Sequence, residues 1–436
     1  MSNASLTPAA GAEWFGQPRG LTILFLTEMW DQFSFFGMRA LLVLYMTKHL
    51  MLAQERASWI YGIYAAMFYF TPIFGGIITD RWLGRRSSVI AGGLIMAAGH
   101  FMMAYENLFL FALGTIALGN GLFLPSLASQ IDSLYTHADP RRKSAYNVYY
   151  VGINLGAFAA PIVIGTVGEV YGFHLGFAIA GLGMIVAMMT YVLGGRYLPP
   201  EPLRRPVASL SGVGTVAQKP TEGFTKRLVL LIAIAAIVVI FRGAYEQLGN
   251  TVSLWADQSV DRRISSNFSI PVTWFQSLNP MTVFLLTPVF VSRWTRLAKQ
   301  DREPSSGKKM VIGATVIGLA YMMVAVTAYW ARARAGGVGW PWMSVFLIVM
   351  TAGELYILPV GLGLFSRLAP KGLTATTIAI WYSAGFLGNL FAGWLGTLWT
   401  PLSHGAFFSI IGTVALLAAL LLAILAPKVG HMERHA

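Results

Sequence analysis

The chain has 436 residues, of which 56% are apolar and only 11% are charged, and it contains no cysteine. Soluble domains carry roughly 25% charged residues, so this composition excludes an ordinary soluble protein. The lack of cysteine excludes a disulfide framework and thiol chemistry.

Twelve mostly apolar segments follow one another along the chain. Each is long enough to cross a bilayer as a helix, which takes about 20 residues, whereas a barrel strand would need about half as many. The expected fold is therefore an all-α membrane protein with twelve transmembrane helices. The predicted helices cover residues 21–47, 57–80, 87–105, 108–135, 144–169, 173–196, 228–257, 268–292, 309–331, 341–366, 373–398 and 404–427.

A polar segment divides these helices into two groups of six. Residues 198–226 are rich in Pro, Gly, Ser and Thr and hold no apolar span, which is typical of a linker. Residues 1–20 lack the basic start, apolar core and cleavage site of a signal peptide. The predicted organisation is an N-terminal cytoplasmic tail (1–20), six-helix bundles (21–197 and 227–428), a cytoplasmic linker (198–226) and a C-terminal tail (429–436).

Most of the 31 Lys and Arg residues lie in the tails and in the loops that follow even-numbered helices. The positive-inside rule therefore places both termini in the cytoplasm, and we expect a multi-pass protein of a bacterial inner membrane, surrounded by lipid. Because this topology accounts for the net charge of +13, nucleic-acid binding is not expected.

The first predicted helix carries ionisable residues inside its apolar run, namely Glu28, Asp31 and Arg39. An ionisable side chain in hydrocarbon costs several kcal/mol unless it faces a partner or a watery cavity. Glu28 and Asp31 are three residues apart and share one helix face, and Arg39 lies close to that face. A stripe of this kind favours a transporter over a simple membrane anchor.

Several motifs stand within or between the predicted helices. GGIITDRWLGRR (75–86) joins the second and third helices and resembles the loop signature of the major facilitator superfamily. Further segments resemble, in order, the proton-dependent oligopeptide transporter family of that superfamily. These segments are FSFFGMRALLVLYM (33–46), GNGLFLPSL (119–127), YNVYYVGINLGAF (146–158), YEQLGN (245–250), WFQSLNP (274–280) and GELYILPVGLGLFSRLAP (353–370).

The resemblance implies a major facilitator fold with two six-helix halves that imports di- or tripeptides, or close peptide-like solutes, with protons by alternating access. It implies a monomer, and no cofactor or metal is expected. The candidates for proton coupling are Glu28, Asp31, Glu246 and Glu354. The candidates for substrate binding are Arg39, Gln32, Tyr69, Tyr146, Tyr150, Asn154, Arg242, Asn279, Glu354 and Trp381.

These residue types suit a peptide zwitterion, which needs a cation near its carboxylate, an anion near its ammonium group and amides for its backbone. By resemblance, Glu354 would receive the substrate amino group. Asn154 and Asn279 would offer donors and acceptors to peptide groups, and the aromatic residues would form amphipathic walls. The alternative is structural: the two amides bond neighbouring helices and the aromatic rings pack.

Two cations of the family pattern are missing from this sequence. Gln32 stands in place of a first-helix arginine and Leu124 in place of a fourth-helix lysine. Arg242, four residues before Glu246, shares a face with it and stands where the family commonly has a large aromatic residue. We hypothesise that the substrate-facing cation has moved to Arg242; the alternative is an Arg242–Glu246 pair without a substrate role.

Other functions remain open on the sequence. The missing cations favour a carrier of a non-peptide or carboxylate-free metabolite with altered or absent proton coupling. A non-transporting membrane sensor would tolerate them too, although it does not explain the retained acids. An enzyme is not expected, since no metal-binding, nucleophile or phosphate-loop motif occurs and His100 is the only histidine that the predictions place well inside a helix.

Overall fold

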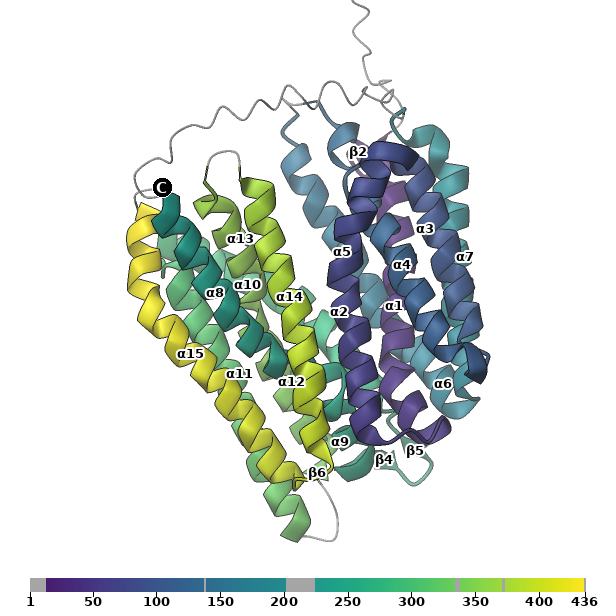
Figure 1. Cartoon of the computed structure of the whole chain (residues 1–436), viewed down its shortest axis with the longest axis vertical. Helices are drawn as coiled ribbons and strands as arrows, with labels where there is room; N and C mark the ends of the chain where they lie inside the picture. The colour runs from purple at the N-terminus through teal and green to yellow at the C-terminus, as the bar shows by residue number, and fades with distance from the viewer. Residues whose placement is uncertain (1–12, 137–138, 201–223, 334–337, 371–372, 435–436) are drawn as a thin grey trace, which may run out of the picture. The chain divides into compact units, whose positions relative to one another are not determined.

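The computed structural model describes residues 13–136, 139–200, 224–333, 338–370 and 373–434. Helices account for nearly all of them (Figure 1). Nine helices within these ranges are long and apolar enough to cross a membrane. Most of the predicted linker, much of the predicted N-terminal tail and the last two residues lie outside the described residues.

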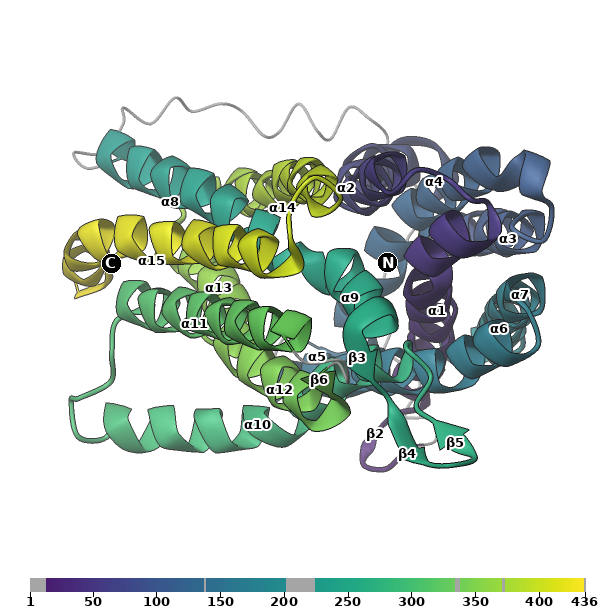
Figure 2. The ribbon, with the colours of Figure 1, turned by 90° about the horizontal axis from the view of Figure 1, so that it is seen from below.

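The first of two compact units comprises the described residues within 1–39 and 71–214. Its α3 helix packs against both α4 and α7 (Figure 2). A short antiparallel hairpin precedes the first helix. The elements that contribute to this unit are β1 (Glu13–Trp14), β2 (Gln17–Pro18), α1 (Arg19–Leu44), α2 (Gln54–Ile78), α3 (Arg85–Met102), α4 (Phe109–Ala128), α5 (Arg142–Ala160), α6 (Thr166–Val170) and α7 (Phe173–Leu193).

The second unit comprises the described residues within 40–70 and 215–436, so it includes the end of α1 and most of α2. In this unit α11 packs against α15 and α12, and α8 packs against α14 (Figures 1 and 2). Strands β3 and β6 pair in parallel, and β4 and β5 form a hairpin. Its further elements are α8 (Phe224–Tyr245), α9 (Thr251–Ser259), β3 (Val260–Asp261), β4 (Arg263–Ser265), β5 (Phe268–Ser269), α10 (Trp274–Ala298), α11 (Ser306–Ala333), β6 (Val338–Gly339), α12 (Trp340–Leu355), α13 (Leu358–Leu368), α14 (Thr374–Gly396) and α15 (His404–Arg434).

Each of the twelve predicted segments contains helix, but α1, α3 and α10 are not among the nine membrane-crossing candidates. In α1 the cause is composition, because Glu28, Asp31 and Arg39 interrupt the apolar run. Three predicted helices are also broken. The segment 144–169 is divided into α5 and α6 by a π-helical turn at Pro161–Gly165. The segment 228–257 is divided into α8 and α9 by a tight turn at Glu246–Gly249, and 341–366 is divided into α12 and α13.

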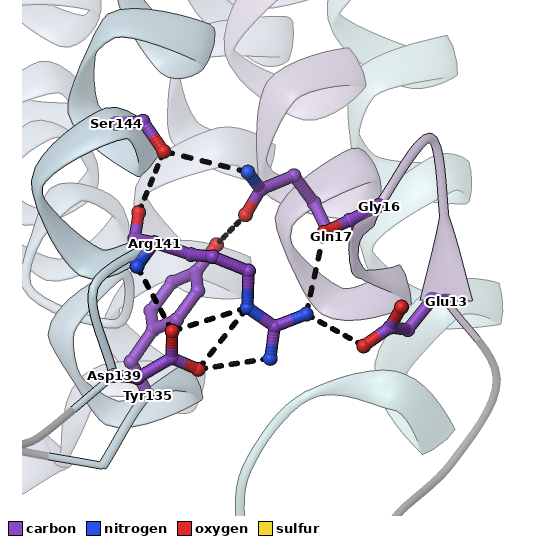
Figure 3. Close-up of polar contacts among 7 residues, drawn as sticks. All are labelled: Glu13, Gly16, Gln17, Tyr135, Asp139, Arg141 and Ser144. Atoms are coloured by element: carbon purple, nitrogen blue, oxygen red, sulfur yellow. Dashed lines mark hydrogen bonds and ion pairs between the residues drawn. The ribbon is translucent and has the colours of Figure 1, made fainter.

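The N-terminal hairpin, where the sequence predicted only a tail, is tied to the segment between α4 and α5 (Figure 3). The Arg141 guanidinium donates to Glu13 at 2.6 Å and to Asp139 at 2.8 Å, and the Tyr135 hydroxyl donates to Gln17 at 2.7 Å. The hydrogen bonds from Arg141 lower the pKa of the Asp139 carboxyl below its ordinary value. This network therefore holds the start of the described chain against the first unit.

Candidate substrate and proton sites

The acids predicted on α1 are buried and joined by a neutral amide. Glu28 is fully buried and Asp31 is 3% exposed. Gln32 donates from its amide nitrogen to Glu28 Oε1 at 2.9 Å and to Asp31 Oδ2 at 3.2 Å. Gln32, which by resemblance stands in place of a first-helix arginine, contacts both acids as a hydrogen-bond donor without charge.

A residue missed by the sequence analysis completes this group. Tyr149 on α5 is buried and donates from its hydroxyl to Glu28 Oε2 at 2.5 Å. Both carboxylate oxygens of Glu28 thus accept a hydrogen bond, one from α1 itself and one from α5. We call Glu28, Asp31, Gln32 and Tyr149 the N-terminal acid cluster.

Two glycines bring α5 close enough to α1 for this contact. Gly152 and Gly156 are four residues apart, which is the small-residue spacing of closely packed membrane helices. A Cβ atom at Gly152 would lie 2.9 Å from the Phe25 carbonyl oxygen, and one at Gly156 would lie 2.1 Å from that of Met29. Larger side chains at these positions would push α5 away, so the GINLG sequence positions the Tyr149 hydroxyl.

The other predicted residues of α5 lie at four-residue spacing, hence on one helix face. Tyr146 is 43% exposed and Tyr150 is 49% exposed. Asn154 donates from its side-chain nitrogen to the Tyr150 carbonyl at 2.9 Å, so this bond stays within its own helix. Arg39, also predicted, is half-buried two helical turns beyond Asp31 on α1.

In the second unit, Arg242 is buried and forms two hydrogen bonds. Its Nη1 donates to Glu246 Oε1 and to the Tyr69 hydroxyl, each at 2.9 Å. The guanidinium carbon also lies 4.9 Å from the centre of the Tyr69 ring, within cation–π range. Gly388 on α14 makes room for this arginine, because a Cβ atom there would lie 2.4 Å from Arg242 Cβ.

Glu354 belongs to a neighbouring group in the same unit. It accepts a hydrogen bond from the Asn279 side chain at 2.6 Å and another from Tyr245, a second residue that the sequence analysis missed. Its charge also interacts with Glu246 and Arg242. The C-terminal polar cluster, as we name it, consists of Tyr69, Arg242, Tyr245, Glu246, Asn279 and Glu354.

Trp381 differs in its surroundings from the other predicted aromatic residues. It is 4% exposed, and its ring packs against the Phe365 ring at 5.1 Å and directly over Gly361. Most of the indole surface is therefore taken up by packing between α13 and α14. Tyr69, by contrast, contacts Arg242, a charged member of the C-terminal polar cluster.

The apolar helices, together with buried acids and an arginine inside them, define an integral, multi-pass helical membrane protein with charged groups in its interior. The POT family matches residues 86–219 and 213–410, and the chain belongs to this family of peptide transporters. Since the members of this family are transporters, the prediction that the chain is not an enzyme is confirmed.

Relatives and solved structures agree with this assignment over nearly the whole chain. A peptide transporter of Yersinia enterocolitica is 31% identical over 91% of this chain and 90% of its own length. A di-/tripeptide transporter of Lactococcus lactis subsp. cremoris is 29% identical over 94% of this chain and 96% of its own. The crystal structure of a mutant POT peptide transporter in complex with alafosfalin superimposes with a TM-score of 0.86 at 30% identity, covering 98% of this chain and 97% of that one.

Proposed function

We propose that this protein imports di- or tripeptides, or close peptide-like solutes, together with protons by alternating access. Membership of the POT family supports the peptide-like substrate, as do the names of the relatives. Ionisable residues inside membrane helices mark substrate and ion pathways, and the two buried clusters supply such residues.

In this proposal twelve helices cross the inner membrane of a bacterium in two six-helix halves, and both termini are cytoplasmic. The nine apolar helices are joined by α1, α3 and α10, each of which coincides with a predicted span. The distribution of Lys and Arg supports the orientation. The protein acts as a monomer, in keeping with the family that the sequence resembles.

The N-terminal acid cluster is the proposed proton site. Two buried carboxyl groups share one neutral amide donor, Gln32, and no cation takes part in their hydrogen bonds described above. An ionised carboxylate is costly to bury, so protonation of either Glu28 or Asp31 removes a large part of the free-energy cost of burying two charges. Gln32 can donate to whichever of the two acids carries the negative charge, and Tyr149 donates to Glu28.

Arg242 is the proposed partner of the substrate carboxylate. The main evidence for this assignment is that the Nε of Arg242 is buried and has no hydrogen-bond acceptor in the described ranges. Its Nη1, by contrast, donates to Tyr69 and Glu246. A buried unpaired donor is unfavourable, and a carboxylate would satisfy it with a charge-assisted bond. Glu354, held by Asn279 and Tyr245, is the proposed partner of the substrate ammonium group.

Uptake into proteoliposomes tests this function. A labelled dipeptide should accumulate when an inward proton gradient is applied, and its C-terminal amide should compete poorly. Arg242→Gln should abolish the preference for a free carboxylate. Arg263→Gln is the matched control, since it removes an arginine that is also paired with an acid, Asp261, in an exposed hairpin. Carboxylate preference that survives in Arg242→Gln would refute the assignment.

The alternative is a carrier of a carboxylate-free solute. The observation that favours it is the neutral Gln32 between Glu28 and Asp31, where the family pattern has a cation. In that case the dipeptide amide would compete as well as the dipeptide itself, and uptake would depend weakly or not at all on the proton gradient.

A further inference from the structure

A cavity of about 1190 Å³ opens at one end of the second unit. It lies where α10 and α15 end and α11 begins (left edge of Figure 2), beside α13. The charge distribution of the sequence assigns this end to the cytoplasm. The cavity is distinct from the C-terminal polar cluster, none of whose residues lines it among the described part of the chain.

Most acidic groups of this cavity are already engaged. Glu303 accepts a hydrogen bond from Lys309 Nζ at 2.5 Å, and that ammonium also lies 4.3 Å from the Trp294 ring centre. Glu433 accepts from Arg367 at 3.1 Å and from the backbone N–H of Ser306, the first residue of α11, at 3.0 Å. The remaining acid on the lining is Asp301, which is exposed.

Three further cations line the same cavity: Arg302, Lys308 and Arg434. Across the described ranges, their side chains enter neither an ion pair nor a hydrogen bond. With Lys309 and Arg367, the lining holds five basic side chains against three acidic ones. Like charges that converge on a concave surface repel one another and create a positive potential that attracts anions.

We propose that this cavity binds a phosphate group, either the headgroup of an anionic phospholipid or a free phosphate in the cytoplasm. A phosphate presents several acceptor oxygens and so can bind Arg302, Lys308 and Arg434 at once, whereas each acid on the lining reaches only its neighbours. Basic pockets between membrane helices on the cytoplasmic side are known to hold lipid headgroups. Binding here would steady the junction of α10, α11 and α15 during transport.

The test compares two triple variants of the full-length protein. Arg302→Gln, Lys308→Gln and Arg434→Gln removes the unpaired cations of the cavity. Arg293→Gln, Arg296→Gln and Lys299→Gln is the matched control, because it removes three exposed cations from the nearby end of α10 that do not line the cavity. Phosphatidylglycerol binding is measured by native mass spectrometry against phosphatidylcholine, and inorganic phosphate binding by calorimetry.

A Lys or Arg that contacts a bound anionic headgroup contributes roughly fivefold to its affinity, and the three cations removed in the control lie outside the cavity lining. The cavity variant should therefore lose about tenfold or more in affinity for whichever probe binds, while the control should change by less than about threefold. Selective loss of phosphatidylglycerol identifies the lipid as the source, and selective loss of inorganic phosphate identifies the free anion. Failure of the unmodified protein to bind either probe, or equal losses in both variants, would overturn the proposal.

Discussion

The contact between α1 and α5 depends on a glycine, and Gly156→Ala tests this directly. The added Cβ atom would start 2.1 Å from the Met29 carbonyl oxygen, and side chains essentially never approach such an atom closer than 3.0 Å. The helices must therefore separate. A shift of this size would stretch the 2.5 Å bond between Tyr149 and Glu28 past the normal upper limit of about 3.0 Å. Overpacking of this kind costs about 1–3 kcal/mol.

Gly114→Ala is the matched control, because a Cβ atom at Gly114, also inside a helix of the first unit, meets nothing within 4 Å. Both variants gain the higher helix propensity of alanine, about 1 kcal/mol. The difference between their Tm values therefore reports the clash at residue 156 alone. Thermal unfolding in detergent should give a lower Tm for Gly156→Ala than for Gly114→Ala, and proton-driven uptake should fall only in Gly156→Ala. Equal Tm values with equal uptake would refute the close-packing argument.

Tyr149→Phe should reduce gradient-driven uptake several-fold and leave gradient-independent exchange of substrate nearly unchanged; an equal fall in both would contradict a role in proton handling. Gly388→Leu should weaken substrate binding by displacing Arg242, visible as a raised KM for dipeptide, and an unchanged KM would argue against that position. Arg141 lowers the pKa of the Asp139 carboxyl. The ionised carboxylate therefore stabilises the N-terminal hairpin fully at pH values above its ordinary pKa of 3.8, and this stabilisation is lost as the pH falls below that value. Asp139→Asn should therefore speed hydrogen exchange of residues 13–18 at neutral pH, whereas the unmodified protein should resemble the variant only in acid.

The helices were predictable because an apolar run of sufficient length has few alternatives to a membrane helix. The points at which these helices are interrupted could not be predicted in the same way. The apolar run continues through Glu246–Gly249 and through the break before α13, so run length cannot reveal where the backbone leaves the α-helical path. The first break adjoins Arg242 and Tyr245, members of the C-terminal polar cluster, as expected where discontinuous helices form transport sites.

The membership of the two clusters was predictable in part. Glu28 and Asp31 could be assigned to one face of α1 from their spacing alone, and Arg242 and Glu246 to one face of the predicted helix 228–257. The contacts of Tyr149 with Glu28 and of Tyr245 with Glu354 depend on how two helices are rotated against each other, which the sequence of either helix does not specify. The GINLG spacing was the available signal, since it marks the face of α5 that packs closely.

Gln32 and Arg242 are best understood together. An amide on α1 can hold two acids by hydrogen bonds, but it cannot balance a substrate carboxylate, which needs a cation in a site of low dielectric constant. A cation on α8 can balance the substrate carboxylate only if its hydrogen bond to Glu246 leaves another donor unpaired. Arg242 meets this condition, because its Nε has no acceptor in the described part of the chain. Gln32→Arg combined with Arg242→Phe would restore the family pattern on both helices. If the cation has moved between them, this double variant should regain carboxylate preference that Arg242→Phe alone has lost; failure to regain it would mean that the two changes are unrelated.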